Sequence, residues 1–143
     1  MIKHFDKFYL TDDKAILLDK YIEINTLLQN AYWAKDRDAS VMRDAIANSL
    51  NYAVFESSSE KLVGYARVVT DYATVYYLCD VFVDEFFRGL GLGKMLIEWI
   101  LLHEEKLNGI NGLLKTRDAK ALYENYGFEE CQSICMIKKG TDI

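Results

Sequence analysis

The sequence predicts a mixed α/β fold in which helices cover both faces of a central, mostly antiparallel sheet. The apolar patterns along the 143 residues give the order strand, two helices, three strands, helix, strand, helix and strand. A glycine-rich turn joins an apolar strand to the longest predicted helix. The strands on either side of that helix should run parallel, joined by a right-handed crossover. No linker or repeat interrupts residues 1–143, so we expect a single domain.

The first half of the chain is predicted to supply one strand, two helices and a hairpin. Asp19 and Ser40 are residue types that favour helix N-caps, and helical apolar spacing follows each of them. The residues between the two helices break that spacing, so we expect a loop there. The predicted elements are a strand at 5–11, helices at 19–31 and 40–50, a loop at 32–38, and hairpin strands at 52–55 and 62–69.

The second half is predicted to supply the central strand, the main helix, and a shorter helix between two strands. Asp118 favours a helix N-cap, and Gly127 is typical of the residue just after a helix. The predicted elements are strands at 74–83, 113–116 and 131–137, and helices at 91–107 and 118–126.

Composition excludes several classes of protein. Apolar residues make up 51% and aromatic residues 13%, which is typical of a globular chain. The net charge of −5 argues against a nucleic-acid partner and mildly favours cationic substrates. No apolar segment approaches the roughly 20 residues of a membrane span, and no signal peptide is recognisable, so we expect a cytoplasmic protein with no membrane partner. The three cysteines lack the spacing of zinc ligands, so we expect reduced thiols and no metal.

The most informative segment is the turn from Arg88 to Lys94, in which Gly89, Gly91 and Gly93 alternate with other residues. Glycines leave the backbone N–H groups free of Cβ atoms at the point where a helix N-terminus adds partial positive charge. Such a turn binds anions, and diphosphates are its usual ligands. Arg88 and Lys94 add two side-chain cations. The alternative is a glycine-rich turn that holds no ligand.

The glycine spacing excludes two other phosphate-binding loops. A P-loop needs Ser or Thr after Gly-Lys, whereas Met95 follows here. A dinucleotide fingerprint needs Gly-x-Gly-x-x-Gly, which these alternating glycines do not form. The pattern Arg-x-x-Gly-x-Gly, from Arg88 to Gly93, resembles the acetyl-CoA pyrophosphate loop of the GNAT superfamily of N-acetyltransferases. The element order resembles the GNAT fold over nearly the whole chain, although Glu85 stands where many members have a proline.

This resemblance implies an N-acetyltransferase that transfers an acetyl group from acetyl-CoA directly to a primary amine. The pyrophosphate would lie on the glycine loop, and the pantetheine arm would lie like an extra strand at the end of the preceding strand. Family resemblance also implies a homodimer. The residues implied for acetyl-CoA binding are Phe82, Val83, Arg88, Gly89, Leu90, Gly91, Gly93 and Lys94.

A second block, from Asp118 to Phe128, resembles the late helix of the family, in which a tyrosine before Gly-Phe protonates the departing CoA thiolate. Tyr123 holds that position, and Tyr126 is the second choice for the same role. A phenol suits this role because it can hydrogen-bond to sulfur without titrating at neutral pH. The alternative is a packed tyrosine, one of ten in the chain.

The central strand contains one carboxylate, Asp80, among mostly apolar residues. Burying an unpaired carboxylate is costly, so Asp80 needs a catalytic role or a partner such as Arg67 on the neighbouring strand. The segment resembles the polyamine N-acetyltransferase branch, although Cys79 replaces the glutamate usually proposed there as a base. Strand alternation puts Tyr77 and Cys79 on one face and Asp80 on the other, unless a bulge intervenes.

The acceptor site is expected in the loop between the first two helices, in the turn before the central strand, and on that strand. Aromatic faces and carboxylates suit an ammonium group, whereas Arg37 would instead bind the carboxylate of an amino-acid substrate. Alternatively, Trp33 packs the helix pair and the charges are only solvated. The candidate residues are Tyr32, Trp33, Asp36, Arg37, Asp71, Tyr77 and Cys79.

Three functions follow from these observations. The first is an N-acetyltransferase acting on a small-molecule amine. The second is a protein or peptide N-acetyltransferase of the same fold, which would need an open groove. The third is a non-catalytic acetyl-CoA-binding module, which would bind acetyl-CoA without releasing CoA for any amine.

Overall fold

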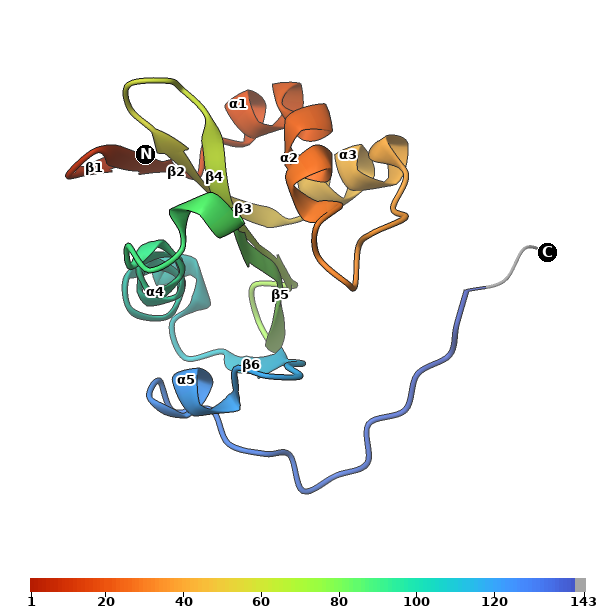
Figure 1. The fold of residues 1–143 in the computed structure, drawn as a ribbon. Helices are drawn as coiled ribbons and strands as arrows, with labels where there is room; N and C mark the ends of the chain where they lie inside the picture. The colour runs from red at the N-terminus through yellow and green to blue at the C-terminus, as the bar shows by residue number, and fades with distance from the viewer. Residues whose placement is uncertain (141–143) are drawn as a thin grey trace.

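The computed structural model describes residues 1–140, which form a six-stranded sheet with helices on both faces (Figure 1). The strands follow the chain order across the sheet. Neighbouring strands are antiparallel except β5 and β6, which run parallel as the sequence predicts. The strands are β1 (Ile2–Phe5), β2 (Phe8–Thr11), β3 (Leu50–Glu56), β4 (Leu62–Thr70), β5 (Val75–Val83) and β6 (Asn111–Leu114).

The helices divide into two groups that pack on opposite faces of the sheet (Figure 1). Side chains of β3 alternate between the faces, so that Tyr52 and Val54 join one apolar core while Ala53 and Phe55 join the other. The core with Tyr52 and Val54 includes side chains of α4 (Leu92–Glu98) and α5 (Lys120–Glu124). The core with Ala53 and Phe55 includes side chains of α1 (Lys14–Asp19), α2 (Tyr21–Leu28) and α3 (Ala39–Ala47).

The N-terminal prediction of one strand at 5–11 is wrong, because the chain reverses inside it. Asp6 adopts a left-handed φ of 48°, which makes a tight turn between β1 and β2. The single helix predicted at 19–31 is wrong, because the chain forms α1 and α2 there: Asp13 caps α1, Asp19 is the last residue of α1, and α2 begins after Lys20 without a side-chain cap. Asp38, and not Ser40, caps α3, since its carboxylate accepts a hydrogen bond from a first-turn amide, and α5 begins after Ala119 without the predicted cap from Asp118. The hairpin of β3 and β4 is confirmed.

The main helix is shorter than predicted. Helix α4 is followed by a π-helical turn at Trp99–His103 and a 3₁₀ turn at Glu105–Leu107. The helix ends at Glu104, because the extended backbone of this residue breaks the helical path. The Glu104 carboxylate accepts hydrogen bonds from Lys106 N at 3.2 Å and from the Tyr52 hydroxyl at 2.7 Å, which hold this break in place. No helix formed by residues 1–140 is long and apolar enough to cross a membrane.

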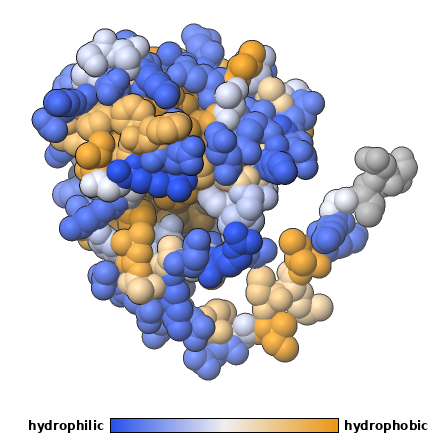
Figure 2. All heavy atoms as spheres, in the orientation of Figure 1, coloured by the Kyte–Doolittle hydropathy of each residue, from blue (hydrophilic) through white to orange (hydrophobic). Residues whose placement is uncertain are grey.

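The prediction of a final strand at 131–137 is also wrong. Gly127, with φ +91°, ends α5 as the sequence predicts, and the chain then leaves the sheet (Figure 1). Residues 131–137 pair with no strand in the described part of the chain, so Ile134 is 90% exposed and Met136 is 88% exposed. The strand pattern is present, but the segment lacks a neighbour to pair with. Figure 2 shows this tail extending from the molecular body with apolar side chains exposed along it.

Candidate active site

The site is built where β5 parts from β6. The two strands pair only over Val75–Leu78 and Asn111–Leu114, which leaves the β6-facing edge of β5 without a strand partner from Cys79 onward. Asp80 has φ +53°, and the register with β4 shifts by one residue around it. This β-bulge turns β5 away from β6 and opens a cleft while β5 stays paired with β4.

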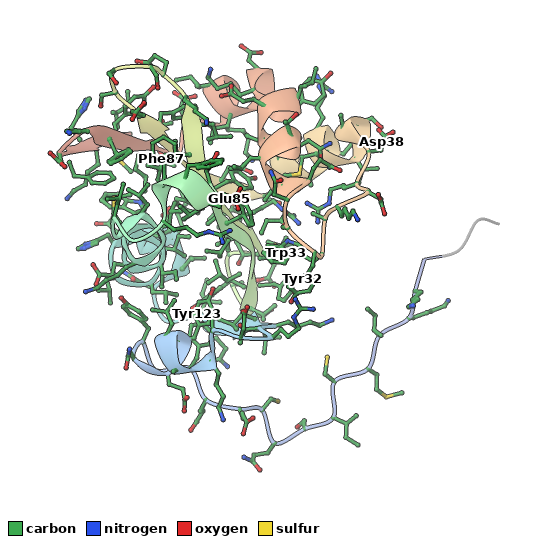
Figure 3. The ribbon with its side chains drawn as sticks, viewed as in Figure 1. Tyr32, Trp33, Asp38, Glu85, Phe87 and Tyr123 are labelled. Atoms are coloured by element: carbon green, nitrogen blue, oxygen red, sulfur yellow. The ribbon has the colours of Figure 1, made fainter. Side chains whose placement is uncertain are left out.

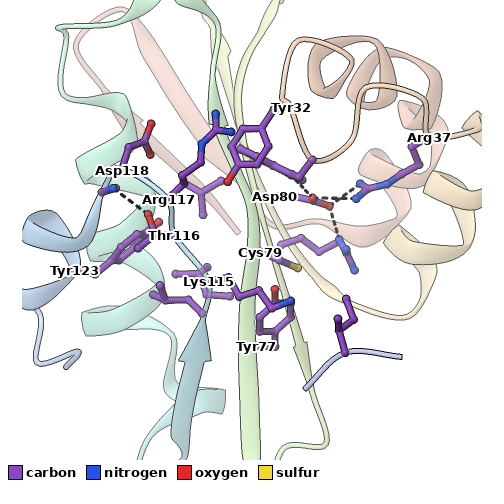
Figure 4. A pocket seen from close by; sticks show the side chains of 17 residues that line it. Tyr32, Arg37, Tyr77, Cys79, Asp80, Lys115, Thr116, Arg117, Asp118 and Tyr123 are labelled. Atoms are coloured by element: carbon purple, nitrogen blue, oxygen red, sulfur yellow. Dashed lines mark hydrogen bonds and ion pairs between the residues drawn. The ribbon is translucent and has the colours of Figure 1, made fainter. Parts of the chain in front are cut away.

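The cleft contains a cavity of about 500 Å³ (Figure 4). Side chains from five segments line it: the α2–α3 loop, strands β4 and β5, the residues from the end of β6 into α5, and Ile137 of the C-terminal tail. Of the sequence-predicted residues, those that the structure brings to this cavity are Tyr32, Trp33, Arg37, Tyr77, Cys79, Asp80 and Tyr123.

Two of the acceptor-site candidates lie outside this cavity. Asp71 caps the β4–β5 turn, because its carboxylate accepts bonds from the amides of Ala73 and Thr74, at 2.9 and 2.7 Å, and from the Thr74 hydroxyl. These hydrogen bonds lower the pKa of Asp71. Asp36 is exposed in the α2–α3 loop and does not line the cavity. Both carboxylates therefore lie apart from the other candidates.

Asp80 is the best-bonded carboxylate of the site. Its Oδ1 accepts from Trp33 Nε1 at 2.8 Å and from Arg37 at 3.2 Å, and its Oδ2 accepts from Arg37 and from Arg67 Nε, each at 2.8 Å (Figure 4). The pairing with Arg67 is the one that the sequence suggests. Only 4% of Asp80 is exposed. The carboxylate thus ties the α2–α3 loop and β4 to the bulge in β5.

The same contacts keep Asp80 ionised. Burial raises the pKa of this carboxyl, but the hydrogen bonds and positive charges of Arg37 and Arg67 outweigh burial and lower the pKa below its usual value. A carboxylate with a lowered pKa and four donors around it is a weak proton acceptor at neutral pH. The chemistry of Asp80 therefore favours anchoring over general-base catalysis.

Tyr123 lies in α5, on the far side of the cavity from the α2–α3 loop (Figure 3). Its ring packs edge-on against Phe128, with 5.9 Å between the centroids, and 9% of the residue is exposed. Its hydroxyl has no hydrogen-bond partner among residues 1–140. Burial, assisted by the nearby charge of Asp118, raises the pKa of Tyr123. The phenol is therefore protonated at neutral pH and free to donate.

Tyr126, the second choice, faces elsewhere. Its hydroxyl donates to Glu98 of α4 at 3.0 Å, and the residue does not line the cavity. Cys79 lines the cavity, but burial raises the pKa of its thiol to about 11. A thiol in that state is a poor nucleophile, which agrees with a direct transfer that needs none.

Tyr32 and Trp33 form the aromatic wall of the cavity (Figure 3). Their rings meet edge to face at 5.0 Å, and Trp33 also meets Phe82 of β5 edge-on at 6.2 Å. The indole N–H is held by Asp80, so the wall has a defined orientation. The ring of Trp33 thus packs against β5 and still faces the cavity.

The glycine loop has the backbone form of an anion cradle. Gly89 and Gly91 have φ values of +81° and +82°, and no atom lies within 4 Å of a Cβ built on either residue. Within residues 1–140, the amides of residues 88–94 donate to no backbone or side-chain acceptor outside α4, and the first amides of α4 have no partner inside the helix. Free amides converging at a helix start fit a diphosphate.

The side chains beside this loop complete the cradle. Arg88 folds back over the end of β5, where its Nε donates to the Val83 carbonyl at 3.1 Å and its guanidinium lies 5.3 Å from the Phe82 ring centre. Lys94 is exposed and pairs loosely with Glu98 at 3.7 Å. The predicted acetyl-CoA residues thus occupy one continuous surface, from the open edge of β5 to the start of α4.

Sequence reasoning missed the polar wall that follows β6. Lys115, Thr116, Arg117 and Asp118 line the cavity, although none of them was a candidate ligand residue. The sequence contains a signal for this wall, because the polar run begins at Lys115, at the end of a short apolar segment whose strand is expected to run parallel to β5. Residues that follow neighbouring parallel strands lie at the same edge of a sheet.

The chain is similar to known acetyltransferases. A family profile described as "Acetyltransferase (GNAT) domain" matches residues 48–130. The uncharacterized N-acetyltransferase ycf52 of Pyropia yezoensis is 30% identical over 129 residues, which cover 87% of this chain and 71% of the relative. Its counterpart in Porphyra purpurea is 28% identical over 142 residues, which cover 87% of this chain and 80% of that relative. The crystal structure of a Xanthomonas campestris pv. campestris protein described as a GNAT-family acetyltransferase matches with a TM-score of 0.78 and 36% identity, covering 90% of this chain and 89% of that one.

Replacing Asp80 tests the anchoring cluster. Asp80→Asn leaves Arg37 and Arg67 facing an amide, so we expect the free energy of unfolding at pH 7 to fall by about 3–5 kcal/mol. Because the folded pKa of Asp80 is lowered, its contribution is present above the unfolded pKa of about 4 and is lost as the pH falls through the folded pKa. The difference between wild type and Asp80→Asn should therefore shrink below pH of about 4.

Urea unfolding at pH 7 and at pH 3 measures this difference. The control is Asp36→Asn, which changes an exposed carboxylate of the same loop and should stay within about 0.5 kcal/mol of wild type. An Asp80→Asn protein as stable as wild type at pH 7 would contradict the anchoring role.

Proposed function

This chain belongs to the GNAT acetyltransferase family, and we propose that it transfers the acetyl group of acetyl-CoA to the primary amine of a small molecule by direct attack. Acetyltransferase activity of the GNAT type follows from the family, whereas the donor and the class of acceptor are our proposal. The observation that carries it is one cavity that is lined both by Tyr123, whose phenol stays protonated, and by the open edge of β5. We propose that residues 1–143 act as a single domain.

The donor half of the proposal is supported by the free backbone groups at the end of β5. The amides of residues 88–94 and the cations of Arg88 and Lys94 would hold the pyrophosphate. The unpaired edge of β5, including Phe82 and Val83, would take the pantetheine arm through backbone hydrogen bonds. When bound, acetyl-CoA supplies an activated thioester carbonyl.

The catalytic part of the proposal is supported by the protonation state of Tyr123. Tyr123 would donate its proton to the leaving thiolate, and a raised pKa keeps that proton available across the neutral range. The sequence leaves a catalytic role and a structural pairing open for Asp80, and we propose that it acts as a positioning residue through Trp33 and Arg37. The proton of the attacking amine would then leave through water in the cavity.

The size of the cavity favours a small acceptor over a protein. A volume of about 500 Å³ between the α2–α3 loop and α5 suits a metabolite-sized ligand. Turnover restricted to peptides would instead favour a protein N-acetyltransferase. Tight binding of acetyl-CoA without release of CoA for any amine would favour a non-catalytic module.

The first test measures CoA release from acetyl-CoA with a thiol reagent, against small amines, amino acids, aminoglycosides and peptides. We expect turnover with a small-molecule amine. With that acceptor, Tyr123→Phe should lower kcat by about 10²-fold or more while the Kd of acetyl-CoA stays near wild type, because only the acid is lost. The matched control is Tyr126→Phe, whose hydroxyl bonds to Glu98 outside the cavity, and its kcat should stay within about twofold. Equal kcat values for wild type and Tyr123→Phe would remove this tyrosine from the mechanism.

Alanine substitutions at two glycines test the proposed acetyl-CoA site. Gly91→Ala puts a methyl group into the open space above the loop amides and strains a φ of +82°, so we expect the Kd of acetyl-CoA to rise about tenfold. Gly109→Ala carries the same strain, at φ +75° and with equally open surroundings, but lies in the turn before β6. Calorimetric titration should give a wild-type Kd for Gly109→Ala. Equal Kd values for both variants would contradict the proposed cradle.

We also propose a homodimer in which the 131–137 tail of one copy pairs with the free edge of β6 in the other. Two observations support it: β6 has a partner on one side only, and the tail exposes Ile134, Met136 and Ile137 (Figure 2). Light scattering should give a dimer for wild type and for Lys138→Asp, but a monomer for Ile134→Asp. A monomeric wild type at high micromolar concentration would overturn the proposal.

We further propose a cytoplasmic location with no nucleic-acid or membrane partner. The net charge of −5 and the three free cysteines, two of them exposed, are consistent with this location. Fractionation of cells that express the protein would measure it, and recovery in a membrane or secreted fraction would overturn it.

A further inference from the structure

The acceptor cavity is lined with more positive than negative charge. Arg37 and Arg67 share the single carboxylate of Asp80, so this side of the cavity keeps an excess of one positive charge. The opposite wall adds Lys115 and Arg117 against the one carboxylate of Asp118. The cavity thus holds four cations and two carboxylates, although the whole chain has a net charge of −5.

The two cations after β6 are available to a ligand. Neither Lys115 nor Arg117 forms an ion pair with any of residues 1–140. The Arg117 guanidinium lies 3.7 Å from the ring centre of Tyr32, which bridges the cavity between the β6–α5 segment and the α2–α3 loop (Figure 4). Stacking on an aromatic face orients the guanidinium and leaves its N–H edges open for an anion.

Thr116 adds a neutral donor between these two cations. Its Oγ1 accepts from the Ala119 amide at 2.9 Å, so the hydroxyl proton is free to point into the cavity. Two cations and a hydroxyl on one short segment match the oxygens of a carboxylate or a phosphate. An ammonium group would instead meet two positive charges and only one unpaired carboxylate.

We infer that the acceptor is an amine that also carries an anionic group, a carboxylate or a phosphate, bound by Lys115, Thr116 and Arg117. This inference rests on the proposed function and specifies its substrate class. The anion holds one end of the acceptor at the β6–α5 wall, so that the amine at the other end reaches the open edge of β5. A polyamine has no anionic group that Lys115, Thr116 and Arg117 could bind.

The acidic net charge of the chain does not oppose this recognition. Charges separated by more than about 8 Å are largely screened at physiological ionic strength. Field lines are focused in a cleft, so the charges that line the cavity decide which ligand it binds. The local excess of positive charge therefore outweighs the distant surface carboxylates.

Matched acceptors that differ by one anionic group test the inference. The pairs are alanine with alaninamide and glucosamine 6-phosphate with glucosamine, and spermidine is the polycation. We expect kcat/KM in at least one pair to be about tenfold higher for the anionic member, because charge-assisted hydrogen bonds are lost in its partner. The better pair distinguishes a carboxylate from a phosphate.

Variants of Lys115 and Arg117 test whether these residues bind the anionic group of the acceptor. Lys115→Gln with Arg117→Gln should raise KM for the anionic acceptor about tenfold and leave KM for its uncharged partner unchanged. The matched control is Arg43→Gln, which removes another arginine that lies over a tyrosine ring, that of Tyr21 at 6.0 Å, outside the cavity. Its KM for the anionic acceptor should equal that of wild type.

The outcomes separate this inference from the proposed function. Turnover of glucosamine, alaninamide or spermidine in preference to the anionic acceptors overturns the inference and leaves the transferase intact. A higher Kd for acetyl-CoA in the double variant assigns Lys115 and Arg117 to the donor and also overturns it. Calorimetric binding of an anionic acceptor without CoA release supports the anion site and overturns the transferase. An absence of both binding and turnover overturns the inference.

Discussion

The ion cluster around Asp80 is the interaction on which the site depends. A non-glycine residue with left-handed φ inside a strand costs about 1–2 kcal/mol, and it persists only where its surroundings hold it. Arg37, Arg67 and Trp33 provide that support with four hydrogen bonds from a loop and a neighbouring strand. One carboxylate therefore fixes the bulge in β5, the position of the α2–α3 loop and the orientation of the aromatic wall.

The bulge also lets the sheet open without weakening its core. Strand β5 stays paired with β4 on both sides of Asp80, while its contact with β6 ends at Leu78. Leu96 and Ile97 of α4 remain fully packed against the sheet beside the opening. The strand then leads directly into the glycine loop, so the open edge, the cavity and the anion cradle lie along one continuous stretch of backbone.

Features encoded within a few neighbouring residues could be predicted from the sequence, and features that depend on distant partners could not. The glycine loop, the β3–β4 hairpin and the helix end at Gly127 each follow from local residue types. The break at Glu104 depends on Tyr52, 52 positions away, and the cluster at Asp80 joins residues 13 to 47 positions apart. The role of the polar wall after β6 could be recognised only from the folded structure, in which Arg117 contacts Tyr32 across the cavity.

The two best-placed titratable groups of the cavity have pKa values shifted in opposite directions. Burial raises the pKa of Tyr123, which keeps the phenol protonated, while Arg37 and Arg67 lower the pKa of Asp80, which keeps the carboxylate ionised and saturated with donors. Cys79, with a raised thiol pKa of about 11, adds no proton acceptor. Under the proposed function, Tyr123 thus supplies a general acid, whereas neither Asp80 nor Cys79 supplies a base. The acceptor amine must then reach the cavity in its neutral form, and the positive wall around it favours that form because nearby cations lower the pKa of an ammonium group.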